Sequence, residues 1–332
     1  MPRKTELPSK TQSHNHPTKV AIVGAGNVGA TFAYALLLSG LAAEIVLIDS
    51  NRAKAEGEAM DLNHTVPFTH PTRIWAGHYA DCAGAVVTVL AAGTGQQPGE
   101  TRLDLIKKNA AIWREIVPKV ATYNPGGILL VATNPVDVLT YAAWKLSGLP
   151  AERVIGSGTI LDTSRFRYQL SQHFGVDASS VHAFIIGEHG DSEVPVWSSA
   201  NIAGMHLPEF CAAHNLPYDP QVMDQIFHQT RDAAYHIIER KGATYYAVAA
   251  GLMRITQAIL RDQRTVLSVS SLIRDYQGLR DVCLSLPSVV DRGGIAKVLR
   301  LQLDPPEIEK LRHSAEILQR IIKSLELDGI SS

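Results

Sequence analysis

The stretch Lys19-Val-Ala-Ile-Val-Gly-Ala-Gly-Asn-Val-Gly29 decides the fold of this chain. An apolar run ends in three closely spaced glycines, and a helical pattern follows from Ala30 to Leu38. In a strand–turn–helix unit of this kind, the glycines permit a tight turn, a close approach of the backbone to a pyrophosphate and close packing of the helix on the strand. The stretch therefore predicts a dinucleotide site. Its expected residues are Gly24, Gly26, Asn27, Val28 and Gly29.

The next apolar run supplies a second part of the same site. The segment Glu44–Ile48 predicts a strand, and Asp49 follows it about 20 residues after the last glycine, where an acid meets the adenosine ribose. A carboxylate there accepts hydrogen bonds from both ribose hydroxyls and repels a 2′-phosphate, so we expect NAD rather than NADP. The alternatives are a turn that binds no nucleotide and a different nucleoside ligand, such as a methyl donor.

Apolar runs continue to alternate with helical patterns along the first half of the chain. Further strands are expected at 85–92, 127–133 and 154–158, which together predict a doubly wound parallel sheet. Ligands of such sheets lie beyond the carboxyl ends of the strands, and a polar segment follows each of these runs. The first such segment, Gly93–Arg102, has three glycines and a proline, a composition that suits a hinged lid.

The second half of the chain has a more mixed pattern. We expect a helix that begins at Ile160, one long helical stretch from Gln221 to Arg261, strands at 266–271 and 282–286, and an amphipathic helix at 306–327. The last helix has an apolar face that packs either on the core of its own chain or on a sister subunit.

These patterns predict an α/β fold class, a Rossmann-type doubly wound parallel sheet with a second α+β substrate domain. The expected divisions are a disordered arm at 1–18, an NAD-binding domain at 19–158 and a substrate domain at 159–328.

The composition is that of an ordinary globular protein. Apolar residues make up 45% of the 332 positions, charged residues make up 19%, and the net charge is −1. This balance gives no bias toward nucleic acid or an anionic membrane, and no apolar run reaches the roughly 18 residues of a membrane helix. The three cysteines lie far apart. We therefore expect a reducing cytoplasm, with neither a disulfide framework nor a zinc ribbon.

The segment Ile185–Trp197 carries the main candidate for catalysis. His189 follows an apolar run and lies between Gly187 and Gly190. An imidazole takes or gives a proton at working pH, and the glycines let the backbone bend so that the ring stands clear in a cavity. With NAD nearby, the economical reaction is hydride transfer between the nicotinamide and a carbon that bears a hydroxyl or carbonyl group, with His189 moving the proton.

Three further charged side chains fit the same reaction. Asp162 can fix the tautomer of His189 and stabilise its imidazolium form. Arg165, on the same helical face as Asp162, suits a substrate carboxylate. Arg102 can polarise the reacting carbonyl when the glycine-rich segment closes. These assignments indicate a 2-hydroxy or 2-oxo acid as the substrate.

Six motifs occur in order between residues 19 and 327. They are Gly24–Gly29, Pro98–Arg102, Thr133–Asp137, Gly158–Arg167, Ile186–Asp191 and Lys241–Thr244. With these motifs the chain resembles the lactate and malate dehydrogenases, and within that family the bacterial L-lactate dehydrogenases.

The resemblance implies a role for each matching residue. It implies that His189 is the acid and base, that Asp162 is its partner, that Arg165 anchors the substrate carboxylate and that Arg102 is the lid arginine. It also implies that Asn134 contacts nicotinamide and substrate, and that Thr244 belongs to the substrate wall. A homotetramer that takes part in fermentative glycolysis is implied as well.

In this family, one lid position separates the lactate type from the malate type, and here that position falls on Gln96. The malate type has arginine there, because a second substrate carboxylate in a closed, dry site needs a cation. A neutral amide leaves that carboxylate uncompensated, at a cost of several kcal/mol. Gln96 therefore favours pyruvate and L-lactate, with malate dehydrogenase as the alternative.

Arg167 and His182 resemble the pair that lines an anion site between subunits in bacterial members activated by fructose 1,6-bisphosphate. Arg167 projects from its helix opposite to Arg165, so an effector bound on one face can bias the substrate arginine on the other. The alternative is a solvated arginine and a core histidine.

Two other kinds of protein are weighed against an active dehydrogenase. A catalytically idle NAD-binding scaffold has no need of His189, Asp162, Arg165 and Arg102 together. A metal site on the acids beside His189 is not expected, because adjacent residues rarely converge on one ion.

Overall fold

The computed structural model describes residues 18–95 and 102–326. The arm expected at 1–18 therefore lies outside the described residues except for Thr18, and Gln96 also lies outside them. Arg102 is described only as the first residue of a helix, without its side chain.

Six parallel strands form one part of the main sheet and include one of its edges. They are β1 (Lys19–Val23), β2 (Glu44–Ile48), β3 (Arg73–Ala76), β4 (Val87–Leu90), β5 (Ile128–Val131) and β6 (Val154–Gly156). Their spatial order is β3-β2-β1-β4-β5-β6, so the order reverses between β1 and β4. A crevice forms at such a switch point, beyond the carboxyl ends of the two strands. The predicted doubly wound sheet is confirmed, and β1 and β2 have the bounds expected from their apolar runs.

Three antiparallel strands from the second half of the chain extend this sheet. They are β12 (Thr265–Ile273), β13 (Val282–Asp291) and β14 (Gly294–Val298). The strand β12 joins the parallel strands at β6, where Ser270 pairs with Gly156. The two halves of the chain thus share one sheet, a continuity that the sequence pattern did not predict, and β14 was not expected as a strand.

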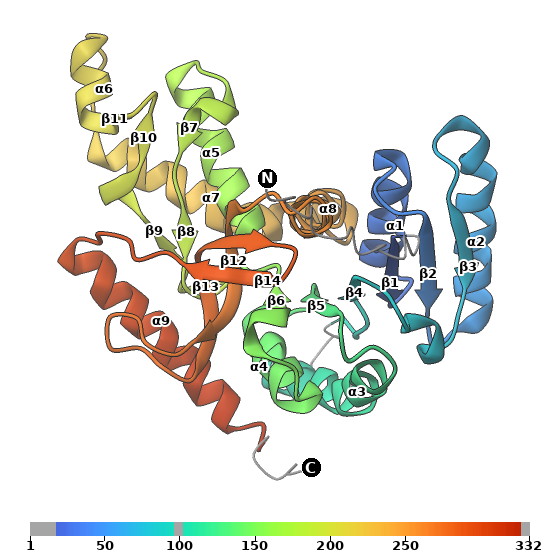
Figure 1. Cartoon of the computed structure of the whole chain (residues 1–332). Helices are drawn as coiled ribbons and strands as arrows, with labels where there is room; N and C mark the ends of the chain where they lie inside the picture. Colours follow the sequence, from blue (N-terminus) through green and yellow to red (C-terminus); the bar gives the residue numbers. More distant parts are fainter. Residues whose placement is uncertain (1–17, 96–101, 327–332) are drawn as a thin grey trace, which may run out of the picture.

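Helices cover both faces of the sheet. The helices of the first half are α1 (Asn27–Ser39), α2 (Arg52–Thr65), α3 (Arg102–Tyr123) and α4 (Val136–Ser147). Those of the second half are α5 (Ile160–Phe174), α6 (Leu207–Ala213), α7 (Pro220–Lys241), α8 (Tyr246–Leu260) and α9 (Pro305–Lys323). Phe32 of α1 and Leu252 of α8 belong to one apolar core, whereas Trp113 of α3 and Leu139 of α4 belong to another. Figure 1 shows α1 and α8 on one side of the sheet and α3 and α4 on the other.

The long helical stretch expected from Gln221 to Arg261 is confirmed except for an interruption at residues 242–245. The structure has two helices there, because α7 ends at Lys241 and Gly242 adopts a left-handed conformation with φ of 81°. The Gly242 N–H donates to the carbonyl of Ile238 at 2.8 Å, which closes the helix end. Gly242 is thus a helix terminator.

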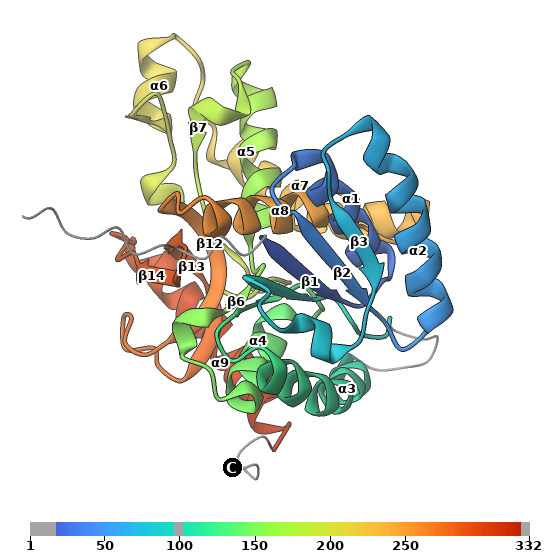
Figure 2. The ribbon, with the colours of Figure 1, turned by 45° about the vertical axis from the view of Figure 1, so that its right-hand side comes forward.

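Short strands complete the second half of the chain. They are β7 (Val181–His182), β8 (Ile185–Ile186), β9 (Val194–Pro195), β10 (Asn201–Ile202) and β11 (Met205–His206). In Figure 2, β7 and α6 rise at the top of the molecule, away from β1, β2 and β3. The strands β8 and β9 pair antiparallel, so that they present the intervening loop, residues 187–193.

The apolar face of α9 packs on the core of its own chain. Leu311, Ala315 and Leu318 are buried in a cluster with Leu284 and Leu286 of β13. This packing decides between the two placements that the sequence left open for the last helix. Among the described residues, no helix is long and apolar enough to cross a membrane.

Candidate active site

His189 lies in the loop between β8 and β9, and the loop is fixed at its start by Gly187. The backbone of Gly187 exchanges two hydrogen bonds of 2.9 Å with Ser285 of β13. Gly187 has φ of 87°, and a Cβ at this position would lie 2.8 Å from Oγ of Ser314 on α9. The next residue, Glu188, donates its N–H to the same Oγ at 2.7 Å. A glycine is therefore required here on both conformational and steric grounds.

The backbone of His189 is held by a buried acid from the other half of the chain. Its N–H donates to Oδ2 of Asp137 at 2.7 Å. Asp137 lies in the first turn of α4 and is 1% exposed. Burial raises the pKa of Asp137 to about 6, against the opposing effects of Ser270 and His189. Asp137 belongs to the Thr133–Asp137 motif, but its sequence context predicted no role for it. Its sequence signal is an acid within an apolar helix directly after Asn134-Pro135.

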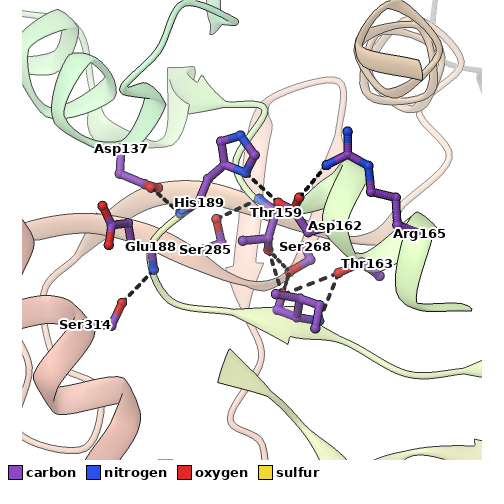
Figure 3. Close-up of polar contacts among 11 residues, drawn as sticks. Asp137, Thr159, Asp162, Thr163, Arg165, Glu188, His189, Ser268, Ser285 and Ser314 are labelled. Carbon is purple, nitrogen blue, oxygen red and sulfur yellow. Dashed lines mark hydrogen bonds and ion pairs between the residues drawn. The ribbon is translucent and has the colours of Figure 1, made fainter. Parts of the chain in front are cut away.

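The imidazole of His189 faces Asp162 of α5. Nδ1 of His189 lies 2.5 Å from Oδ2 of Asp162, and Oδ1 of Asp162 accepts a hydrogen bond of 3.1 Å from Nη1 of Arg165. In Figure 3 the imidazole and the guanidinium flank the Asp162 carboxylate from opposite sides. Because Nδ1 is turned toward Asp162, Nε2 is the ring nitrogen that remains for a ligand.

These contacts set the protonation states of the pair. Burial lowers the pKa of His189, but the charge of Asp162 and its hydrogen bond, with smaller effects of Asp137 and Glu193, outweigh it and raise the pKa to about 9. Burial raises the pKa of Asp162, whereas His189 and Arg165 outweigh that effect and hold it below its usual value. The free site therefore carries an imidazolium–carboxylate pair at neutral pH.

A set of buried hydroxyl groups fixes α5 against β8. The Thr159 hydroxyl donates to the carbonyl of Ile185 at 2.6 Å and shares a 2.8 Å hydrogen bond with Ser268 of β12. The Ser268 hydroxyl reaches the same carbonyl at 2.7 Å, and Thr163 accepts from the Ile185 N–H at 3.0 Å. Figure 3 shows these groups beneath the His189–Asp162 pair. The network holds the strand before His189 and the helix that carries Asp162 in one register.

A cavity of about 280 Å³ adjoins the imidazole. It brings together four of the residues that the sequence singled out, namely Asn134, Asp162, Arg165 and His189. Nη2 of Arg165 is buried and has no hydrogen-bond partner among the described residues. A buried guanidinium nitrogen without a partner carries a desolvation cost that an anion in the cavity can offset.

Part of the cavity wall comes from residues that the sequence did not predict as site residues. The helix α7 contributes Arg231, Ala234, Tyr235 and Ile238, and the loop contributes Asp191 and Glu193. The α7 residues are spaced by three, one and three positions, which places them on one helix face. The spacing is visible in the sequence and indicates a shared helix face. The neighbouring residues in the sequence do not show, however, that this face lines a cavity.

A second cavity, of about 690 Å³, lies at the switch point of the sheet. Gly24, Gly26 and Asp49 line it. The Asp49 carboxylate accepts hydrogen bonds from the backbone N–H groups of Ala25, at 2.7 Å, and Asn51, at 2.8 Å. The end of β2 is thereby tied to the glycine turn after β1.

The glycine turn fits a dinucleotide. A Cβ at Gly24 or Gly29 would overlap the protein backbone, whereas no atom lies within 4 Å of a Cβ built at Gly26. The helix α1 begins at Asn27, and Val28 is its second residue. No side chain caps the first N–H groups of this helix. Those N–H groups and the open space at Gly26 suit a pyrophosphate.

The remaining predicted site residues lie elsewhere. Thr244 lies between α7 and α8, and it is not among the described residues that line the 280 Å³ cavity. Arg167 projects away from that cavity, and its Nε donates to the carbonyl of Ala183 at 2.9 Å. Arg167 lines a separate cavity of about 400 Å³, together with Arg254 of α8. His182 is exposed on β7 and is not among the described residues lining that cavity.

The chain matches two family models over almost all of the described residues. Residues 18–156 match the lactate/malate dehydrogenase NAD binding domain, and residues 159–327 match the lactate/malate dehydrogenase alpha/beta C-terminal domain.

Relatives of known name cover nearly the whole chain. A probable L-lactate dehydrogenase of Schizosaccharomyces pombe is 54% identical over 310 residues, which are 93% of this chain and 94% of the relative. The L-lactate dehydrogenase of Priestia megaterium is 52% identical over 94% of this chain and 98% of its own length. The ligand-bound crystal structure of a minor L-lactate dehydrogenase from Enterococcus mundtii superposes with a TM-score of 0.91, at 42% identity, and covers 94% of this chain and 99% of that one.

Proposed function

Because this chain belongs to the lactate/malate dehydrogenase family, we propose that it is an L-lactate dehydrogenase, which interconverts pyruvate and L-lactate with NAD. The observation that carries this proposal is the Arg165 guanidinium. One nitrogen, Nη1, is held by Asp162, while Nη2 is buried and lacks a partner among the described residues. Nη2 is therefore available to bind the carboxylate of a small 2-oxo acid in the cavity beside His189.

In this reaction, His189 supplies the proton that the carbonyl oxygen of pyruvate takes up. The raised pKa of His189 keeps it an imidazolium at neutral pH, so Nε2 can donate to the carbonyl oxygen of pyruvate. NADH, when held at the cavity lined by Gly24, Gly26 and Asp49, would supply the hydride for the carbonyl carbon. In the reverse direction, His189 takes the hydroxyl proton of lactate. Asp162 stabilises the imidazolium form and orients the ring in both directions.

Cofactor binding is assigned to Gly24, Gly26, Asn27, Val28, Gly29 and Asp49. The open space at Gly26 and the Asp49 carboxylate support this assignment. Asn134 lines the substrate cavity directly after β5, a position that suits contact with both nicotinamide and substrate. Arg102 and Thr244 remain part of the proposal on sequence grounds.

We propose lactate rather than malate chemistry because Gln96, in the glycine-rich segment, has no charge. A dicarboxylate such as oxaloacetate needs a second cation in the closed site. The deciding experiment follows the absorbance of NADH with pyruvate and, separately, with oxaloacetate. We expect rapid oxidation of NADH with pyruvate and slower oxidation with oxaloacetate.

The His189→Asn variant is the matched control for that assay. It should still bind NADH, as measured by nicotinamide fluorescence, but should lack turnover because it has no proton donor. No pyruvate-dependent oxidation in the wild-type protein would refute the proposed activity. A preference for oxaloacetate would reassign the enzyme to malate.

We further propose a cytoplasmic homotetramer that responds to fructose 1,6-bisphosphate. The cysteines Cys82, Cys211 and Cys283 are free thiols, which suits a reducing compartment.

The effector proposal rests on the separate cavity of about 400 Å³. Arg167 and Arg254 line it, and two guanidinium groups suit a doubly phosphorylated ligand. Pyruvate saturation curves with and without the bisphosphate test the effector, and an Arg167→Gln variant should not respond. Identical saturation curves with and without the bisphosphate would refute the effector. The proposed tetramer is tested separately, by measuring the molar mass with light scattering.

A further inference from the structure

The cavity beside His189 contains a buried acid that the proposed reaction does not use. Glu193 lies at the end of the loop 187–193, where its N–H donates to the carbonyl of Gly190 at 3.1 Å. The residue is 6% exposed and lines the cavity. Its Oε1 is buried and has no hydrogen-bond partner among the described residues. A carboxylate in this position would have an oxygen without water and without a donor.

The charges that face Glu193 come from three elements. The helix α5 contributes Asp162 and Arg165, the loop 187–193 contributes His189, and α7 contributes Arg231. Arg231 is itself engaged by Asp232, with 2.9 Å between Nε and Oδ1. Asp191, which also lines the cavity, accepts a 2.8 Å hydrogen bond from the Tyr235 hydroxyl.

The balance of these charges favours a neutral Glu193. Burial raises the pKa of Glu193 well above its usual value, and the nearby Asp162 carboxylate raises it further, against the opposing effects of His189, Arg165 and Arg231. With Glu193 protonated, three cations of the cavity wall face two carboxylates. The cations are His189, Arg165 and Arg231, and the carboxylates are Asp162 and Asp191. The site then has an excess positive charge for a substrate carboxylate, and an ionised Glu193 would cancel it.

We propose that Glu193 is a second proton-linked group of the substrate site, so that binding of one 2-oxo acid requires a proton on Glu193 as well as one on His189. Glu193 thereby sets the alkaline limit of substrate affinity. It acts through the charge of the cavity and takes no part in the transfer of hydride or proton. This inference rests on the proposed function, because it assumes that an anion binds at Arg165.

Linkage between binding and protonation makes the proposal measurable. If binding requires two protons, the Kd of an anion rises more than tenfold per pH unit once both groups begin to lose their protons. If binding requires only the proton on His189, the rise cannot exceed tenfold per pH unit. A suitable probe is oxamate, an unreactive analogue of pyruvate, bound to the enzyme–NADH complex and followed by quenching of nicotinamide fluorescence between about pH 7 and about pH 10.

Three proteins are compared. For the wild type we expect a rise steeper than tenfold per pH unit at the alkaline end. For Glu193→Gln, which has nearly the same shape but no ionisation, we expect at most a tenfold rise per unit. The control is Asp191→Asn, which removes an exposed carboxylate from the same cavity and should keep the steep wild-type dependence. A purely structural effect of Glu193→Gln would instead change Kd by the same factor at every pH.

The possible outcomes separate this inference from the proposed function. A wild-type slope of tenfold per unit or less overturns the role of Glu193, and so does a Glu193→Gln variant as steep as the wild type. Should that variant fail to fold, Glu193→Ala replaces it with the same expected slope, because it also removes the ionisation of this side chain. If the wild type neither binds oxamate nor reduces pyruvate, the proposed function fails first.

Discussion

The carboxylate of Asp162 lies 2.5 Å from Nδ1 of His189, although the two residues are 27 positions apart in the sequence. Asp162 is 4% exposed, so its charge is poorly screened by water. The pair combines the proposed proton donor with the carboxylate that raises its pKa.

Replacing Asp162 by asparagine should remove that charge while leaving the shape of the site. Because Asp162 raises the pKa of His189 to about 9, its loss should lower that pKa, so the imidazolium should be lost at a lower pH. We expect kcat/KM for pyruvate to fall at least about 100-fold and its alkaline limb to move to lower pH. The measurement is a pH profile of initial rates. The exposed Asp224→Asn serves as control, and an unmoved alkaline limb in Asp162→Asn would contradict the assignment.

Replacing Arg165 by lysine should weaken substrate binding. Lysine keeps the charge, but it cannot contact Asp162 and a substrate carboxylate through two nitrogens in one plane. We expect KM for pyruvate to rise about 10- to 100-fold, which corresponds to the roughly 1.5–3 kcal/mol of one charged hydrogen bond. Steady-state kinetics give the value. Arg300→Lys, at an exposed ion pair with Asp275, should leave KM unchanged, and an equally small change in Arg165→Lys would argue against a bound carboxylate at this position.

Replacing Asp49 by serine should relax the choice of cofactor. The carboxylate at the end of β2 repels a 2′-phosphate, and a hydroxyl does not. We expect kcat/KM for NADPH to increase about tenfold or more relative to NADH, as measured with saturating pyruvate. The matched control is Asp61→Ser, an exposed acid on α2. If the ratio of kcat/KM for NADPH to that for NADH is unchanged in Asp49→Ser, the adenosine ribose does not bind at Asp49.

Replacing Gly187 by alanine should destabilise the loop that carries His189. Gly204 offers a matched control, because its φ of 83° is similar to the 87° of Gly187, yet no atom lies within 4 Å of a Cβ built there. Both variants strain the backbone by about 1–3 kcal/mol, but only Gly187→Ala also meets Ser314. We expect a larger fall in Tm and a loss of kcat for Gly187→Ala alone. Equal effects on Tm in thermal unfolding would mean that the contact with Ser314 is unimportant.

Replacing Gln96 by arginine should move the substrate preference toward oxaloacetate. The added cation can pair with the second carboxylate of the dicarboxylate, and pyruvate has no group for it. We expect the ratio of kcat/KM for oxaloacetate to that for pyruvate to rise at least about tenfold. Gln97→Arg, at the adjacent position, is the control for a non-specific effect of charge. If both variants show the wild-type ratio, Gln96 is not the residue that meets the substrate side chain.

Short-range patterns in the sequence were enough to predict the nucleotide-binding half of the fold. The run Lys19–Val23, the glycine turn after it and the Glu44–Ile48 run with Asp49 are local features, since each depends on neighbouring residues and on the steric freedom of glycine. The candidates His189, Asp162, Arg165 and Asn134 were also singled out in advance, and the structure brings them to one cavity.

Only the tertiary structure decided which distant groups complete that site. Asp137 reaches the backbone of His189 from α4, Arg231 and Tyr235 line the cavity from α7, and Glu193 turns inward to become a buried acid. Which face of a helix meets a cavity, and whether an acid loses its water, depends on the packing of elements far apart in the chain. The sequence identified the chemical groups of this protein, and the packing determined their surroundings and therefore their charges.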